Sequence, residues 1–419
     1  MNTKTLTLLA ALAMFSFAPV HAQTQGTNYD ESKVPSYTLP DPLVRNNGRP
    51  VKNVRTWEKK RRPEILDLFA REVYGRVPGK PADLHFKVLK ENPKAFGGLA
   101  TMREVGIYFN AQETNYMVLL MYVPNNVKGP VPAFVGVNFK GNHATTDDPE
   151  VSMPTADQLR RYGPNFQVEP RNTAGDRWPF ETILSRGYAI ATFHRADVDP
   201  DFHDGFKNGV HPLFDAGNPR TAESWGTISA WAWGLSRALD YLETDPAVDA
   251  KRVAVFGHSR LGKTALWAGA VDPRFAMVIS NDSGCGGAAL SRRCFGETVG
   301  RINTTFPHWF CDNFKKYNGK ENDLPVDQHE LLALIAPRPL YVASASEDLW
   351  ADPYGEYLSL VGAGPVYALY GYETFTDTAM RPVAVPAVKG RMGHHIRQGK
   401  HNILIYDWLR YLDFADKFL

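Results

Sequence analysis

The stretch RVAVFGHSRLGKTALWAGA, residues 252–270, organises the rest of this 419-residue chain. Residues 253–256 form a short apolar run typical of a buried strand, and residues 263–270 are good helix formers. Gly257, His258 and Ser259 stand between the two segments. A strand that turns into a helix through a Gly-x-Ser corner is a nucleophile elbow, which raises the serine hydroxyl above the carboxyl edge of a sheet. The stretch therefore predicts an α/β fold with Ser259 as a nucleophile.

The same corner allows a second interpretation. In an ordinary β-turn-α connection, a serine at this point would only cap the helix. The general elbow pattern is G-x-S-x-G, whereas Leu261 fills the second small position here and the glycine, Gly262, comes one step later. Both interpretations place the corner at the carboxyl edge of a parallel sheet.

Composition bounds the class of protein. The chain is 43% hydrophobic and 22% charged, which is ordinary for a globular protein of one large or two medium domains. A formal net charge of +2 without a basic block argues against nucleic acid as a partner. Aromatic residues make up 12% of the chain, and such rings stack on sugars but also fill large cores.

The first residues predict export. Lys4 is followed by an apolar run over residues 6–19 and by Val20, His21 and Ala22, which is the pattern of a cleavable signal peptide over residues 1–22. The run is shorter than the roughly 20 apolar residues of a membrane span, and no later segment approaches that length. We expect a soluble protein that is secreted or periplasmic.

The cysteines and acidic loops indicate no metal or cofactor. Cys285, Cys294 and Cys311 are too few for a disulfide scaffold, and one disulfide with a free thiol and three free thiols both remain open. None has a histidine at zinc-like spacing. The acidic residues in 197–219 resemble a calcium loop only in composition, and their spacing favours a solvated loop. We predict a monomer without metal or cofactor.

We divide the mature chain into an N-terminal arm, residues 23–62, and one catalytic domain, residues 63–419. The domain carries loop insertions at its active edge, the longest over residues 147–178. Residues 138–143, after an expected strand, form the loop that would donate a backbone N–H to an oxyanion. The expected strands cover residues 116–124, 131–137, 188–193, 253–256, 276–280, 339–343 and 365–370, and the expected helices residues 63–73, 223–242, 263–270 and 403–416.

Serine, acid and histidine follow one another along the chain, each near the end of a strand or before the last helix. That is the chain order of the α/β-hydrolase triad. We therefore predict an α/β-hydrolase fold, a three-layer αβα sandwich with a mostly parallel central sheet.

Two members of the triad have competitors. His401, between a glycine and the closing helix, is favoured as the base over His394 and His395, which we expect to pack or to line the rim. Asp348 holds the usual place of the acid. Its neighbour Glu347, and Asp282 after the strand that follows the elbow, are alternatives that these residues do not separate.

The elbow and four further motifs resemble the glucuronoyl esterases, carbohydrate esterase family 15, and are most similar to its bacterial branch. The family's elbow pattern, G-C/H-S-R-x-G-K-x-A, matches residues 257–265 and accounts for the displaced glycine. The likeness covers nearly the whole mature chain. The further matching motifs are SNDSGCGGA at 280–288, FPHWF at 306–310, DLWADP at 348–353 and IRQGKH at 396–401.

The resemblance implies a serine esterase that cleaves the ester between 4-O-methyl-glucuronic acid of glucuronoxylan and lignin alcohols. It implies Ser259 as nucleophile and His401 as base, with Arg260 beside the oxyanion. Side chains that contact the sugar acid would be Lys263, Glu297 and Trp350.

Two departures and three rival functions stay open. The family often has glutamate where this chain has Asp282, and many bacterial members have an acid matching Asp348, which we favour. His258 replaces the fungal cysteine beside the nucleophile, so the fungal disulfide to the histidine loop is absent.

An acetyl xylan or other carbohydrate esterase is a rival of the same fold, and a serine peptidase is a weaker one. A non-catalytic carbohydrate-binding homologue is the rival from another class.

Overall fold

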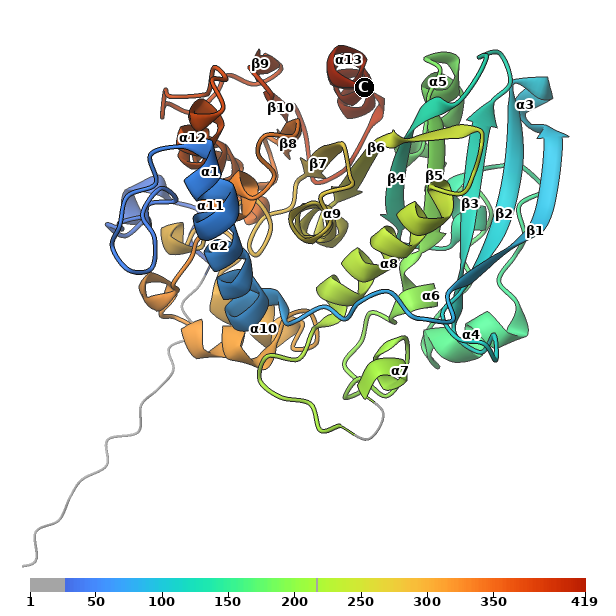
Figure 1. The fold of residues 1–419 in the computed structure, drawn as a ribbon, viewed down its shortest axis with the longest axis horizontal. Coiled ribbons are helices and arrows are strands. Elements are labelled where there is room, and N and C mark those ends of the chain that lie inside the picture. Colours follow the sequence, from blue (N-terminus) through green and yellow to red (C-terminus); the bar gives the residue numbers. More distant parts are fainter. Residues whose placement is uncertain (1–26, 216–217) are drawn as a thin grey trace, which may run out of the picture.

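A ten-stranded sheet forms the centre of the computed structural model, which describes residues 27–215 and 218–419. The predicted signal peptide, residues 1–22, lies outside the described residues. The strands follow the spatial order β1-β2-β3-β5-β4-β6-β7-β8-β10-β9 (Figure 1). Their bounds are β1 (His85–Lys94), β2 (Ala100–Tyr108), β3 (Tyr116–Pro124), β4 (Val131–Asn138), β5 (Ala189–His194), β6 (Val248–His258), β7 (Met277–Asn281), β8 (Leu340–Ala345), β9 (Ala387–Lys389) and β10 (Met392–Arg397).

The sheet is mixed, with a parallel centre. β1, β2 and β3 pair antiparallel, and β3 also runs antiparallel to β5. From β5 through β4, β6, β7 and β8 to β10 every pairing is parallel, and β9 closes the far edge antiparallel to β10. The carboxyl ends of β6, β7, β8 and β10 therefore meet at one edge of the sheet.

Helices cover both faces of the sheet, and this arrangement confirms the predicted αβα fold class (Figure 1). One face packs against α8, α9, α11 and α12, and the opposite face packs against α5 and α13. The helices are α1 (Val54–Thr56), α2 (Arg62–Phe69), α3 (Ala95–Gly98), α4 (Ala156–Tyr162), α5 (Phe180–Ser185), α6 (Arg195–Val198), α7 (His211–Asp215), α8 (Thr227–Leu242), α9 (Arg260–Val271), α10 (Val299–Thr305), α11 (Gln328–Ala333), α12 (Pro353–Leu369) and α13 (Ile405–Phe418).

The tryptophans near α8 belong to the core. Trp231 and Trp233 on that helix and Trp225 just before it are at most 3% exposed. Each is apolar enough to fill the space between the helix and the sheet, so these rings are not free to stack on a sugar. This outcome confirms the core-packing interpretation.

The prediction of a strand over residues 365–370 is wrong. Those residues lie in and just after the last turns of α12, which contains Pro365 and stays helical to Leu369. In the run PVYALY only Val366 and Tyr367 are buried, and short apolar runs do not separate strand from helix by pattern alone. The strand that does complete the parallel part of the sheet is β10.

The solvated interpretation of the acidic loop is wrong for its first two aspartates, Asp197 and Asp199. Asp197 and Asp199 are 3% and 4% exposed, and each accepts hydrogen bonds inside the protein. Asp197 accepts from the Tyr162 hydroxyl at 2.5 Å, and Asp199 accepts from the Thr227 hydroxyl at 2.6 Å. These carboxylates therefore tie the loop to its neighbours rather than to water.

The structure also bears on the expectations about the cysteines and about membrane spans. All three cysteines are free thiols, so the alternative of one disulfide is not realised. Among the described residues, no helix has the length and apolar character that a membrane span requires.

Candidate active site

Ser259 occupies a strained corner between β6 and α9. β6 ends at His258, α9 begins at Arg260, and Ser259 between them has φ 59° and ψ −131°. A positive φ is uncommon for any residue with a Cβ and marks stored strain. The corner is fixed by the Ser259 N–H, which donates to the Asn281 carbonyl at 2.9 Å. This is the backbone of a nucleophile elbow.

Two glycines make the corner possible. A Cβ at Gly257 would collide with the Leu261 carbonyl, because the helix passes directly over the end of the strand. A Cβ at Gly262 would lie 3.0 Å from the Cβ of Ser283 and 3.1 Å from the carbonyl oxygens of Asn281 and Gly257. The helix therefore needs its small residue at position 262, which explains the displaced glycine in physical terms.

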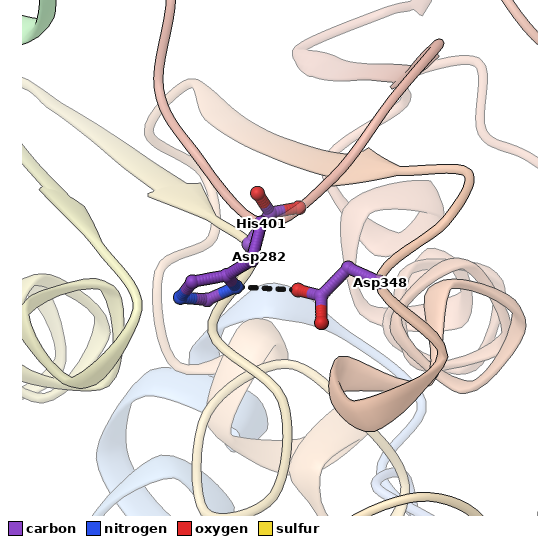
Figure 2. Close-up of side chains that lie close together, drawn as sticks. All are labelled: Asp282, Asp348 and His401. Carbon is purple, nitrogen blue, oxygen red and sulfur yellow. Dashed lines mark hydrogen bonds and ion pairs between the residues drawn. The ribbon is translucent and has the colours of Figure 1, made fainter.

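His401 and Asp348 form a close pair. The Nδ1 atom of His401 lies 2.5 Å from Oδ2 of Asp348, and Figure 2 shows the two side chains facing each other. The Asp348 side chain is 5% exposed, whereas that of His401 is 40% exposed. Because a carboxylate only accepts, Nδ1 carries the hydrogen and Nε2 is left as the basic nitrogen.

The loop that carries His401 is held by an arginine. His401 lies between β10 and α13, and the guanidinium of Arg397, the last residue of β10, donates to the carbonyls of Gln398, Lys400 and Asn402 at 2.8–2.9 Å. Arg397 Nε also donates to Asp407 at 3.0 Å. These bonds fix the loop, so the imidazole is presented on a rigid support.

The ring of His401 lies beside the elbow. Its centroid is 4.5 Å from that of His258, the residue that precedes the serine. In the described part of the chain the Ser259 hydroxyl forms no hydrogen bond with His401. Such bonds are often long without substrate and tighten in the Michaelis complex.

Asp282 lies in the same cluster but is not bonded to the imidazole. Its carboxylate is 1% exposed, and neither oxygen has a hydrogen-bond partner among the described residues. Burial, with Glu356 as the next cause, raises the pKa of Asp282 well above its ordinary value. Arg397 Nη2 and His258 Nδ1 each lie 3.9 Å away. Burial and the neighbouring carboxylate therefore both favour the neutral form of Asp282.

The ligand atoms of Asp282, Asp348 and His401 all lie within 4.8 Å of one another, a spacing that a metal ion could also use (Figure 2). Nδ1 of His401 already forms a hydrogen bond with Asp348. The donor set is therefore better explained as an acid and a base that share a proton.

The other candidate acid and histidines are engaged elsewhere. Glu347 is exposed, and its carboxylate accepts from the Gln398 amide at 3.1 Å rather than from a histidine. His394 and His395 are both 0% exposed within β10. His395 is bonded at both nitrogens, to Tyr341 and to Asp407, while neither nitrogen of His394 has a partner among the described residues.

Arg260 follows the serine and is held by Asp201. Arg260 Nη1 donates to Asp201 Oδ2 at 2.5 Å, and the guanidinium lies 4.5 Å from the ring centroid of Trp309. Burial lowers the pKa of Arg260 to about 10, so it remains a cation at neutral pH. Asp201 also accepts from Arg195, and from Trp309 Nε1 at 2.7 Å. The guanidinium is thus fixed between a carboxylate and an aromatic face, one position after Ser259.

Lys263 and Glu297 form a buried pair one helical turn beyond the serine. Lys263 Nζ lies 3.8 Å from Glu297 Oε2 and donates to the Ser283 carbonyl at 2.5 Å. The two residues are 4% and 8% exposed. Burial raises the pKa of Glu297, and Lys263 opposes that shift. The Glu297 N–H donates to the Trp350 carbonyl at 3.0 Å, so the backbones of these two sequence-predicted residues are joined.

The loop after β4 reaches the elbow from the other side. The Phe139 ring lies 6.3 Å from that of His258, and its carbonyl accepts from His194 Nε2 at 3.2 Å. Arg195 Nε donates to the same carbonyl at 3.3 Å. The predicted oxyanion loop, residues 138–143, therefore lies beside the serine corner.

Sequence reasoning missed three residues of this site, namely Asp201, Arg195 and Glu356. Each has at least one bonding partner that is distant in the sequence. A signal existed for Asp201, which stands in an acidic loop that the sequence otherwise leaves unexplained. No local pattern marks Glu356, which lies inside a helix.

A sheet with a parallel centre, a strained serine corner after β6, and a histidine–carboxylate pair beside that corner define the α/β-hydrolase fold. Comparisons with known proteins narrow this class. Residues 176–371 match the family model described as glucuronyl esterase, fungi. A carbohydrate esterase named MZ0003, from an unknown prokaryotic organism, is 47% identical and covers 98% of this chain and 96% of its own length. The chain belongs to carbohydrate esterase family 15, the glucuronoyl esterases.

Two solved structures are similar over almost their whole length. The glucuronoyl esterase from Solibacter usitatus is 44% identical with a TM-score of 0.86, over 92% of this chain and 99% of that one. A CE15 esterase from the marine bacterial metagenome, described as promiscuous, is 46% identical with a TM-score of 0.85, over 94% of this chain and 100% of that one. Membership of the family makes the protein a carboxylic ester hydrolase.

Proposed function

We propose that this enzyme hydrolyses the ester between 4-O-methyl-glucuronic acid of glucuronoxylan and an alcohol, with lignin alcohols as the natural leaving groups. The observation that carries the proposal is the His401–Asp348 pair beside the strained Ser259 corner, in a chain of the glucuronoyl esterase family. The names of the relatives support the glucuronoyl substrate.

In the proposed mechanism Ser259 attacks the ester carbonyl. A serine hydroxyl is a weak nucleophile, so Nε2 of His401 accepts its proton as the new C–O bond forms. Asp348 holds the other ring nitrogen and stabilises the imidazolium. The intermediate collapses, the C–O bond to the alcohol breaks, and the imidazolium returns its proton to the departing alkoxide. A water molecule then releases the glucuronate by the same two steps.

Arg260 is proposed to stabilise the oxyanion. A guanidinium supplies a full positive charge where charge develops, which is worth more in a partly buried site than in water. Asp201 and Trp309 already fix its position, so little reorganisation is needed as the carbonyl becomes tetrahedral. A backbone N–H of the 138–143 loop would complete the site.

Asp348 is proposed as the principal acid, with Asp282 in a supporting role. Asp348 is the carboxylate that bonds the imidazole, whereas Asp282 is buried without a partner and is driven toward its neutral form. A neutral acid stabilises an imidazolium far less than a carboxylate does.

Lys263, Glu297 and Trp350 are proposed to bind the hydroxyls of the sugar acid. Lys263 lies one helical turn beyond Ser259 and pairs with Glu297, whose backbone is bonded to that of Trp350, and the polar pair offers both a donor and an acceptor. Residues 1–22 are proposed to export the enzyme, which is required for a polymeric cell-wall substrate.

A second candidate function is broader ester hydrolysis, including acetylated sugars. One similar structure is described as that of a promiscuous esterase, which favours this candidate. The two functions share the proposed triad and differ only in what Lys263, Glu297 and Trp350 contribute to substrate binding.

The test compares two substrates. The purified protein is assayed with a benzyl ester of 4-O-methyl-glucuronic acid and with an acetylated xyloside, beside Ser259→Ala. A higher kcat/KM for the glucuronate ester, lost in the variant, supports the proposal. Preference for the acetylated xyloside favours the second candidate, and hydrolysis by neither refutes both.

A further inference from the structure

Glu356 is a buried carboxylate that the mechanism does not use. It lies in the first turn of α12 and is 0% exposed. Oε1 accepts from the Ser283 N–H at 2.7 Å, the Gly284 N–H at 2.9 Å and the Ser283 hydroxyl at 3.0 Å. Oε2 accepts from the Ser344 hydroxyl at 2.5 Å. One side chain therefore satisfies four donors from two different strand ends.

Those donors belong to the segments that carry the two acids. Ser283 and Gly284 directly follow Asp282 at the end of β7, and Ser344 lies near the end of β8, four residues before Asp348. The Glu356 N–H donates to the Asp352 carbonyl at 2.9 Å, so its helix starts where the Asp348 loop ends. Both acid-bearing segments are thus tied to one point.

The same network of contacts extends to Lys263, one of the proposed sugar-contacting residues. The Ser283 carbonyl accepts from Lys263 Nζ at 2.5 Å, so the segment held by Glu356 also holds the lysine. Burial raises the pKa of Glu356 to about 7, and Asp348 contributes to that shift. Burying a carboxylate costs free energy, and that cost is offset only when hydrogen-bond partners satisfy its oxygens.

We propose that Glu356 is a positioning residue, which sets the spacing of the segments after β7 and β8 and so holds Asp348 against His401. The inference rests on the proposed triad and adds a residue that touches neither substrate nor the reacting atoms. Its effect passes through Ser283, Gly284 and Ser344. Loss of these bonds would let the Asp348 loop move, and the imidazole would lose its orientation.

The experiment uses two matched pairs of variants of the whole protein. Glu356→Gln keeps an oxygen that can accept from the Ser283 and Gly284 amides, whereas Glu356→Ala keeps none. Ser344→Ala removes a buried hydroxyl bonded to Glu356. Ser359→Ala removes a hydroxyl on the same helix that is equally buried and has no hydrogen-bond partner among the described residues.

The measurements are kcat and KM with phenyl acetate and with the glucuronate ester, the rate of Ser259 labelling by a fluorophosphonate, and Tm. We expect Glu356→Ala to lower kcat by roughly 100-fold or more with KM little changed, since misplacing a catalytic group by about 1 Å has that effect. Glu356→Gln should recover most of that loss. Ser344→Ala should lower kcat several-fold, and Ser359→Ala should match the parent protein.

The inference is overturned if Glu356→Ala keeps its kcat, or if Ser344→Ala and Ser359→Ala behave alike. If Glu356→Ala does not fold, the comparison of Ser344→Ala with Ser359→Ala, together with Glu356→Gln, tests the positioning role. A parent protein that is labelled by the fluorophosphonate but spares the glucuronate ester contradicts the proposed substrate alone. A parent that is not labelled at Ser259 refutes the triad and the positioning role together.

Discussion

The imidazole of His401 and the carboxylate of Asp348 are 53 positions apart in the chain, and their Nδ1 and Oδ2 atoms are separated by 2.5 Å. The contact arises because β8 and β10 are adjacent parallel strands whose carboxyl ends meet at one edge of the sheet. A short bond between a buried carboxylate and a half-exposed imidazole orients the ring and selects its tautomer. The basic nitrogen is thereby directed away from the acid, in a ring whose centroid lies 4.5 Å from that of His258, the residue before Ser259.

Replacing the serine should abolish turnover. We expect Ser259→Ala to lower kcat by roughly 10⁴-fold or more, as removal of a triad nucleophile does. The change deletes one oxygen at a strained corner, so the variant should fold and keep or raise its Tm. Steady-state assays with the glucuronate ester and a thermal melt check both outcomes. A variant that retains most of the rate would refute the nucleophile assignment.

The two acids should differ sharply in their effect. We expect Asp348→Asn to lower kcat by roughly 10³-fold to 10⁴-fold, because an amide favours the wrong imidazole tautomer. Asp282→Asn should cost less than about tenfold, since Asp282 is already driven toward its neutral form and an amide is a close mimic of a neutral acid. Comparison of kcat for the two variants decides which acid is principal. A larger loss for Asp282→Asn would reverse the assignment.

Lys263 should matter for the sugar acid and not for the acyl chemistry. We expect Lys263→Met to raise KM for the glucuronate ester by about tenfold, the effect of removing one charged hydrogen bond. Phenyl acetate, which has no sugar, is the control and should show little change. An equal effect on both substrates would mean that the lysine acts only by supporting the Ser283 segment.

Two adjacent histidines of β10 should respond oppositely to replacement by phenylalanine, and the effect at His394 should depend on pH. Burial holds the pKa of His394 well below the ordinary value of 6.5, so the folded chain binds fewer protons than the unfolded chain below that pH. Stability contributed by the neutral ring is therefore lost as pH falls through 6.5. We expect His394→Phe to gain Tm relative to the parent between pH 7 and pH 5.

His395 supplies the matched control. Its ring is bonded to Tyr341 and Asp407, so His395→Phe should lower Tm at every pH in the same range. Thermal melts of both variants in a pH series test the pair. A Tm difference for His394→Phe that does not change with pH would contradict the titration argument.

Local sequence patterns predicted the central strands and the elbow well. The predicted strand 116–124 coincides with β3, and the others near the core differ from the structure by a few residues. These segments carry their own signal, since a buried strand is apolar and a helix cap is polar. The assignment failed at residues 365–370, where an apolar run inside α12 lacks the periodicity that separates the two classes.

The supporting contacts of the site could not be read in the same way. Asp201 meets Arg260 59 positions later and Trp309 108 positions later, and Glu356 meets Ser283 73 positions earlier. No window of sequence contains both partners of such a bond. The sequence motifs therefore indicated the proposed catalytic and sugar-contacting residues, while the residues that hold them in place required the fold.

In the sheet order β6-β7-β8-β10-β9, the proposed nucleophile and the proposed base lie at different distances from the sheet edge. Ser259 follows β6, a central strand, whereas His401 follows β10, which is covered on its outer side only by the three-residue edge strand β9. Strands near a sheet edge have fewer packed neighbours and open at lower free energy than central strands. On warming, catalytic output should therefore decline before the far-ultraviolet circular dichroism changes, and amide protons of β10 should exchange sooner than those of β6.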